Sequence, residues 1–155
     1  RPGVLEAALL FEELDVEVIG DGMHLPASLL KLILRTKGAH HMILVTDAMR
    51  AAGLPPGYYK LGSLQGGQTV WSDGTVARMP GGVSFAGSVA TADRLIRVMY
   101  REVGLPLWQA VNMMTRNPAR ALGEREIGVL EPGRKADMVS FDEQIRIDKV
   151  YLAQS

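Results

Sequence analysis

The chain has 155 residues, the length of one ordinary domain, and 47% of them are hydrophobic, which is enough to form a buried core. Its 17 basic and 17 acidic residues cancel, so the composition gives no indication of a nucleic-acid partner. The absence of cysteine excludes disulfides, thiolate metal ligands and a cysteine nucleophile. No apolar run approaches the ~20 residues that span a bilayer, and no signal-peptide pattern occurs. We therefore expect no membrane association and a cytoplasmic location.

Helical and strand patterns alternate at the start of the chain. Pro2 and the apolar spacing after it predict a helix over residues 2–14. A short strand is predicted at 16–20, a Leu-rich helix at 27–36 and a second strand at 42–46. This order of elements is typical of an α/β fold with a parallel sheet.

The pattern changes between residues 50 and 82, where Pro and Gly separate short alternating stretches. A turn signal at Ser72-Asp73-Gly74 indicates a hairpin. We expect a β excursion from the main sheet here, with strands at 58–61, 69–71 and 75–79.

The last part of the chain returns to helices and then ends in strands. We expect three helices, beginning at Ser88, Pro106 and Asn117 and ending near Gly104, Thr115 and Gly123. Residues 136–141 and 145–152 alternate like antiparallel strands. We place a domain boundary near 122–125, which gives a domain over 1–123 and a second over 124–155.

Asp47 is a candidate catalytic residue because of its position. It closes the apolar run at 42–46, and catalytic groups of α/β barrels lie at the C-terminal tips of the strands. A carboxylate there can take a proton from water and return it to a leaving group. The alternative is that Asp47 only caps a following turn, as Asp commonly does.

His24 follows the predicted strand at 16–20 and can donate a hydrogen bond to an anion. The alternative is a solvated histidine at the start of a helix. Asp21, in the same segment, is expected to organise the turn and not to touch a ligand.

The adjacent pair His40-His41 suggests a metal site, but it precedes the strand at 42–46. We therefore expect both side chains at the opposite end from Asp47, as structural or solvated residues. The segment Phe85-Ala86-Gly87-Ser88 precedes a predicted helix, whose free N-terminal amides favour anions. On these residues alone, a phosphate would bind there.

The motifs and their order resemble a known family. The runs at 117–123 (NPARALG) and 128–137 (GVLEPGRKAD) resemble the tail of the amidohydrolase superfamily, where the last barrel helix leads into a small β-sandwich. The upstream motifs at 21–24 (DG-x-H), 45–48 (VTDA) and 86–88 (AGS) resemble, more specifically, the N-acetylglucosamine-6-phosphate deacetylase family.

The resemblance implies an α/β fold class that corresponds to the C-terminal portion of a (β/α)8 TIM-type barrel. The chain would supply the last two strand–helix units with the β-hairpin excursion, followed by C-terminal strands of the small β-sandwich domain. The strands at 16–20 and 42–46 would be the seventh and eighth of the barrel. The sequence, which begins Arg1-Pro2-Gly3, would then be the C-terminal part of a longer protein.

The same resemblance implies roles for individual residues. Asp47 matches the catalytic aspartate of the family and His24 the histidine that contacts the sugar phosphate. The backbone of Phe85, Ala86 and Gly87 is implied to hold the sugar, in place of the phosphate expected from the residues alone. The family's metal ligands, a glutamate and two histidines, lie on earlier strands, and none of them is in this chain.

The implied activity is hydrolysis of the acetamide of N-acetylglucosamine 6-phosphate to acetate and glucosamine 6-phosphate. A metal-activated water would attack, and Asp47 would act as general base and then acid. The resemblance also implies a divalent metal, zinc or iron, in the full-length protein and a homodimer. We expect this chain alone to be inactive and to hold no metal. Two alternatives stay open: another amidohydrolase, dihydroorotase-like or deaminase-like, and a non-catalytic fragment or interaction module.

Overall fold

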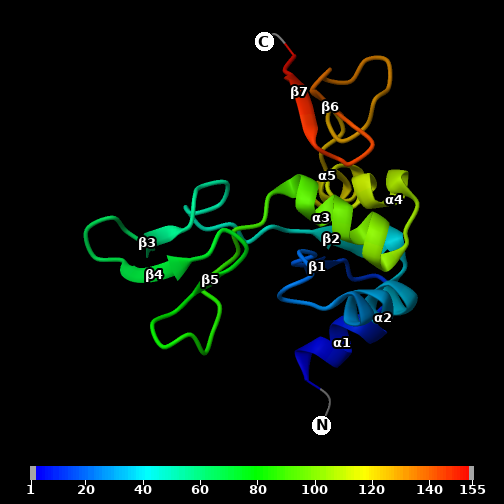
Figure 1. Cartoon of the computed structure of the whole chain (residues 1–155). Coiled ribbons are helices and arrows are strands. Elements are labelled where there is room, and N and C mark those ends of the chain that lie inside the picture. The colour runs from blue at the N-terminus through cyan, green and yellow to red at the C-terminus, as the bar shows by residue number, and fades with distance from the viewer. Residues whose placement is uncertain (1–2, 154–155) are drawn as a thin grey trace.

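The computed structural model describes residues 3–153 (Figure 1). Its helices are α1 (Val4–Leu10), α2 (Ala27–Lys37), the 3-10 helix η1 (Ala39–His41), α3 (Ala92–Val98), the π-helix η2 (Met99–Val103), α4 (Leu107–Asn112) and α5 (Arg116–Ala121). Its strands are β1 (Val16–Val18), β2 (Met42–Leu44), β3 (Gly57–Leu61), β4 (Gln68–Ser72), β5 (Ala77–Arg78), β6 (Met138–Phe141) and β7 (Ile147–Tyr151). Helices and a parallel strand pair confirm the α/β class.

Strands β1 and β2 pair in parallel, with Val16 opposite Met42 and Val18 opposite Leu44. Both strands are shorter than the five residues predicted, because the ladder ends after the Val45 N–H donates to the Val18 carbonyl at 3.0 Å. The main core packs around this pair. It is formed by buried apolar side chains of β1, β2, α2, α3, η2 and α4.

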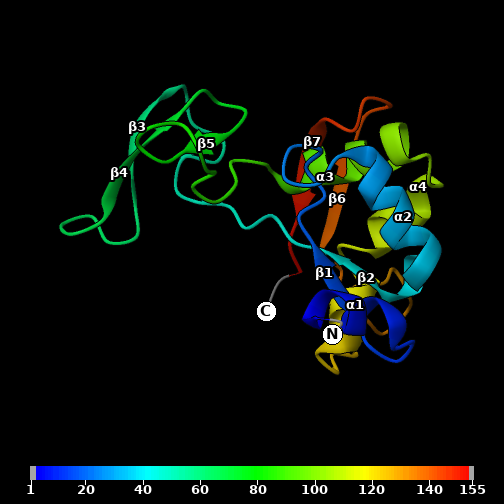
Figure 2. The same cartoon turned by 90° about the horizontal axis from the view of Figure 1, so that it is seen from below.

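The predicted β excursion is present as the antiparallel sheet β3–β4–β5. Its second turn forms where we expected it: the Asp73 carboxylate accepts hydrogen bonds from the backbone N–H groups of Thr75 (2.7 Å) and Val76 (2.8 Å). The sheet has its own small core around Val70, Ala77 and Val89. In both views it projects to the left of the other elements (Figure 1, Figure 2).

Several predicted helix ends were wrong. Helix α1 ends at Leu10 and not at residue 14, since the backbone turns extended at Phe11, with φ −78° and ψ 109°; Pro2 lies outside the described residues. Ser88 does not cap a helix, because α3 begins only at Ala92 with Thr91 as its N-cap.

Asn117 also differs from the prediction. It lies inside α5 instead of capping it, and its buried side-chain amide donates to the carbonyls of Ala39 (2.8 Å) and Met42 (2.7 Å). Helix α4 stops at Asn112, before the predicted end at Thr115. These hydrogen bonds join residues 78 and 75 positions apart, so the local sequence pattern does not reveal that Asn117 connects α5 to η1 and β2.

Strands β6 and β7 pair antiparallel, as predicted for the C-terminal segment. Residues 122–137 connect them to α5 without a helix or strand. The division into two domains near 122–125 stays a prediction. None of the helices in the described part of the chain has the length and apolar character needed to cross a membrane.

Candidate active site

Three sequence motifs converge at one end of the β1–β2 pair. Since the strands are parallel, the segments that follow them, at 21–24 and 47–49, leave from the same edge. Ser88 joins this edge from far along the chain: its N–H donates to the Asp47 carbonyl at 2.9 Å, and its own carbonyl accepts from the Met49 N–H at 2.8 Å. The structure therefore brings together the three motifs that carry the predicted site residues.

Asp21 organises the turn after β1, as expected. Its Oδ1 accepts hydrogen bonds from the backbone N–H groups of Met23 and His24, each at 2.9 Å, and its Oδ2 lies 2.8 Å from the His24 Nδ1. Burial raises the pKa of Asp21, but the hydrogen bonds from His24 and Met23 outweigh burial and hold that pKa below its ordinary value of 3.8. Asp21 is therefore a buried, ionised acceptor near neutral pH.

His24 lies partly buried above this turn, with 17% of its side chain exposed. Its ring is 4.6 Å from the Phe85 ring, centroid to centroid, at an interplanar angle of 47°. The Arg78 guanidinium also lies over the Phe85 ring, 5.1 Å from its centroid. Two of the predicted substrate-binding residues, from segments about sixty positions apart in the chain, thus lie in contact.

Asp47 is exposed at the end of the β2 segment and has an unusual backbone. Its φ is +48°, and among the described residues only Ile145 is another non-glycine with positive φ. Such conformations are sparsely populated for non-glycine residues and cluster at functional sites. Glycine suits position 87 beside it, because its φ is +69° and a Cβ there would lie in tight contact with the Asp47 carbonyl oxygen, at 3.3 Å.

The histidine pair lies at the opposite end of the strands, as predicted, because η1 leads directly into β2. His41 Nδ1 is 2.9 Å from Asp15 Oδ1, and Arg120 donates to that oxygen at 2.7 Å and to the His40 carbonyl at 2.9 Å. Burial raises the pKa of Asp15, but Arg120 and His41 hold it below 3.8. Burial and the charges of Arg120 and His41 lower the pKa of His40. This cluster ties α5 to the start of the sheet.

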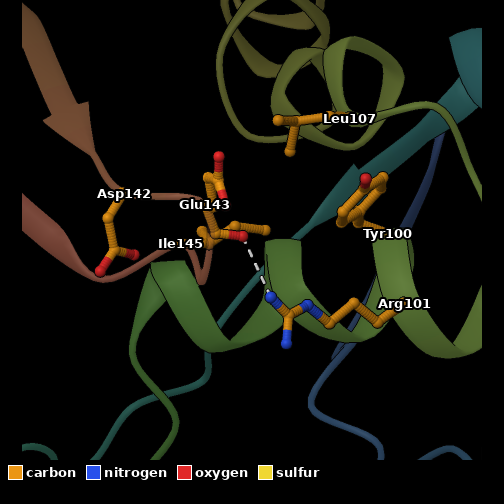
Figure 3. Close-up of a pocket in the computed structure, with 6 residues that line it drawn as sticks. All are labelled: Tyr100, Arg101, Leu107, Asp142, Glu143 and Ile145. Carbon is orange, nitrogen blue, oxygen red and sulfur yellow. Dashed lines mark hydrogen bonds between the residues drawn. The ribbon is translucent and has the colours of Figure 1, made fainter.

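Within residues 3–153, no three His, Cys, Asp or Glu side chains come together in a way that could hold a metal ion. A surface groove is present elsewhere, between η2, α4 and the turn that joins β6 to β7 (Figure 3). In it the Arg101 guanidinium donates to the Glu143 carbonyl at 3.0 Å. The residues that line the groove are Tyr100, Arg101, Leu107, Asp142, Glu143 and Ile145, and none of them belongs to the predicted site.

Sequence reasoning missed the part that Ser88 plays. We expected it at a helix N-terminus, whereas it is 1% exposed and joins the other two motifs. Its hydroxyl accepts a hydrogen bond from the Ala90 N–H at 2.9 Å and lies 3.5 Å from the Asp21 Oδ2. The available signal was the AGS motif itself, but the motif does not indicate which distant residues Ser88 contacts.

Comparisons with known proteins extend over nearly the whole chain. The model of the amidohydrolase family matches residues 5–154. The N-acetylglucosamine-6-phosphate deacetylase of Vibrio furnissii is 37% identical over 152 residues, which cover 97% of this chain and 37% of that protein. The N-acetylgalactosamine-6-phosphate deacetylase of Escherichia coli O157:H7 is 33% identical over 154 residues, covering 98% of this chain and 39% of that protein.

A solved structure gives the same result. The N-acetyl-D-glucosamine-6-phosphate deacetylase of Mycobacterium smegmatis, an Asp-to-Ala mutant in complex with N-acetyl-D-glucosamine-6-phosphate, superimposes with a TM-score of 0.87 at 34% identity. The match covers 98% of this chain and 40% of that one, so the chain spans about two fifths of the length of these relatives. With a family match over nearly its full length, the chain belongs to the amidohydrolase family.

Proposed function

We propose that this chain is the C-terminal part of an N-acetylglucosamine-6-phosphate deacetylase. The observation that carries the proposal is the convergence of the Asp47, His24 and Ser88 segments at the C-terminal ends of two parallel strands. Catalytic residues of (β/α)8 barrels lie at that end. In this proposal β1 and β2 are the seventh and eighth strands of such a barrel, and β6 and β7 belong to a small β-sandwich.

Asp47 has the chemistry that amide hydrolysis needs. A water attacks the carbonyl carbon of the acetamide, and the Asp47 carboxylate takes a proton from that water. The resulting carboxylic acid then gives the proton to the departing amine, and the C–N bond breaks to release acetate and glucosamine 6-phosphate. The exposure of Asp47 supports this role, because a reacting group must reach it.

His24 is the proposed contact of the 6-phosphate. Its Nδ1 faces Asp21, so the Nε2 is the ring nitrogen left for a ligand. The sugar would contact the backbone of Phe85, Ala86 and Gly87. The Ala86 N–H already donates to the Ala77 carbonyl at 2.9 Å, so the sugar contact would use the Ala86 carbonyl or the Gly87 backbone.

A divalent metal, zinc or iron, is also part of the proposal, together with a homodimer. The described residues do not form a metal site by themselves, so the metal ligands would come from outside this chain. The chain alone is then expected to be inactive. Nucleic acid and membrane are not among the proposed partners.

The test is a substrate screen with an enzyme that contains this chain together with the rest of the barrel. Hydrolysis of N-acetylglucosamine 6-phosphate in preference to dihydroorotate and to nucleoside amines is the expected result. The similarity to an N-acetylgalactosamine-6-phosphate deacetylase makes that sugar phosphate the second candidate. Turnover of a cyclic amide or a nucleoside, with no turnover of either sugar phosphate, would contradict the proposal.

A further inference from the structure

Asp21 makes more side-chain contacts than the turn after β1 requires. Its side chain is 1% exposed, and both carboxylate oxygens are engaged. The two backbone N–H groups on Oδ1 form the turn. Oδ2 takes no part in the turn and instead faces the His24 ring at 2.8 Å, with the Ser88 hydroxyl at 3.5 Å.

This contact decides which ring nitrogen of His24 carries a proton. An ionised carboxylate can only accept hydrogen bonds, so Nδ1 must be the donor. A charge-assisted bond of this kind is stronger than a neutral one and resists both ring rotation and a change of tautomer. The Phe85 ring, 4.6 Å away, borders the imidazole from another side. The Nε2 edge therefore has a fixed direction in both charge states of His24.

Ser88 connects this pair to the candidate catalytic residue. Because its Oγ accepts from the Ala90 N–H, its own hydroxyl hydrogen is free to point at Asp21 Oδ2. Its backbone N–H holds the Asp47 carbonyl at 2.9 Å. One buried residue thus touches both the Asp21 carboxylate and the backbone of Asp47.

We propose that Asp21 is a positioning residue that holds a proton on His24 Nδ1 and directs Nε2 to the anionic group of the ligand, to which the ring donates from Nε2 as the imidazolium, with a proton on each nitrogen. Ser88 holds this pair at a set distance from Asp47. The inference rests on the proposed function for the identity of the ligand, a sugar phosphate, but the tautomer of His24 is a property of this chain alone.

The tautomer can be measured directly by long-range ¹H–¹⁵N NMR of the histidine rings in the full chain, with His24→Gln to assign the signal. Unliganded His24 should carry its proton on Nδ1. In Asp21→Asn the amide oxygen can keep the two backbone bonds, while the amide NH2 replaces Oδ2 and donates, so the proton should move to Nε2. Asp15→Asn is the matched control: it should alter the signals of His41, its partner at 2.9 Å, and of the adjacent His40, and should leave the His24 signals unchanged.

A wild-type His24 with its proton on Nε2 would overturn the proposal, and this measurement needs only the assignment variant His24→Gln to fold. An unchanged His24 signal in a folded Asp21→Asn chain would overturn it as well.

Kinetics then connect the tautomer to the ligand. In the enzyme with its complete barrel, Asp21→Asn should raise KM for the phosphorylated sugar roughly ten- to hundredfold, because a neutral amide stabilises the cationic His24 ring that binds the phosphate less than the Asp21 carboxylate does. KM for the unphosphorylated sugar should change little, and His24→Ala combined with Asp21→Asn should cost no more than His24→Ala alone. Equal losses on both sugars would exclude the positioning role.

The two proposals can fail separately. If the sugar phosphates are not substrates but the tautomer changes as expected, the proposed function is wrong and Asp21 still positions His24. If the sugar phosphate is hydrolysed and Asp21→Asn changes neither tautomer nor KM, the proposed function stands and the positioning role is wrong.

Discussion

The same two parallel strands carry an Asp–His pair at each end, and the pairs differ in what surrounds them. Asp21 and His24 lie 2.8 Å apart after β1, and Asp15 and His41 lie 2.9 Å apart before the strands. In each pair a carboxylate oxygen faces the Nδ1 of the imidazole. Residue chemistry alone therefore does not distinguish them.

The two pairs differ in which groups compensate the charge of the carboxylate. Arg120 donates to Asp15 at 2.7 Å and also holds the His40 carbonyl, so this pair is charge-compensated and joins α5 to the strands. Asp21 has no such cation among the described residues that contact it; backbone N–H groups and the His24 ring meet its charge. A compensated pair stabilises the fold, whereas a pair held by backbone dipoles can present its histidine to an anionic ligand.

The largest expected effect is on kcat, and it should distinguish the two ends of the β1–β2 pair. Asp47→Asn, at the C-terminal end, should lower kcat by about 10²–10⁴-fold with KM nearly unchanged, because the amide cannot accept the proton of the attacking water. Asp15→Asn, at the other end, should keep kcat within a few-fold. Steady-state kinetics of the enzyme with its complete barrel measure both, and an Asp47→Asn enzyme changed only in KM would make Asp47 a binding residue.

The two histidines should differ in how they depend on phosphate. His24→Ala should reduce kcat/KM for the 6-phosphate sugar by roughly ten- to hundredfold, which corresponds to about 1.5–3 kcal/mol for a hydrogen bond to a charged group. The unphosphorylated sugar should be affected much less. His41→Ala is the control, and any loss it causes should be the same for both sugars. A phosphate-dependent loss in His41→Ala would remove the distinction between the ends.

At the N-terminal end of the two strands, Asn117 should contribute to the stability of the fold. Replacing it with Ala leaves the Ala39 and Met42 carbonyls without the donor that the buried amide supplies. The hydrogen bond to Met42 is buried, and an unsatisfied buried group costs about 1–3 kcal/mol, so the free energy of unfolding should fall by about that amount. Urea denaturation measures it. Arg120→Lys, whose site is partly exposed, should cost less than about 1 kcal/mol, and the reverse order would contradict the role assigned to Asn117.

The smallest expected effect is a pH dependence of stability, to which Asp21 and Asp15 both contribute. The pKa values of Asp21 and Asp15 lie below 3.8 in the folded chain, so both carboxylates bind protons more weakly when folded than when unfolded. Their contribution to stability is therefore present above pH 3.8 and is lost as the pH falls through the folded pKa values. Asp21→Asn and Asp15→Asn should each destabilise the chain near pH ~6 and approach the wild type near pH ~3. Urea unfolding at both pH values is the check, and a difference that grows on acidification would contradict the sign.

Local signals were sufficient for much of the fold. The apolar run at 42–46 indicated a buried strand, and Asp73-Gly74 indicated the turn between β4 and β5 because its hydrogen bonds span only two or three residues. The organising role of Asp21 was predictable for the same reason, since its backbone partners lie two and three residues away. Strand direction then placed Asp47 and the His40-His41 pair at opposite ends.

The remaining features depend on contacts between distant parts of the chain. Ser88 reaches Asp21 across 67 positions, Asn117 reaches Met42 across 75, and Arg120 reaches Asp15 across 105. A pattern within a helix or strand carries no information about such partners, so Ser88 and Asn117 looked like helix caps. The sequence by itself determined the strands, the turn chemistry and the residue types at the candidate site. Only the tertiary structure decided which Asp–His pair is held by an arginine and which is left facing the site, because burial and charge compensation arise where distant segments meet.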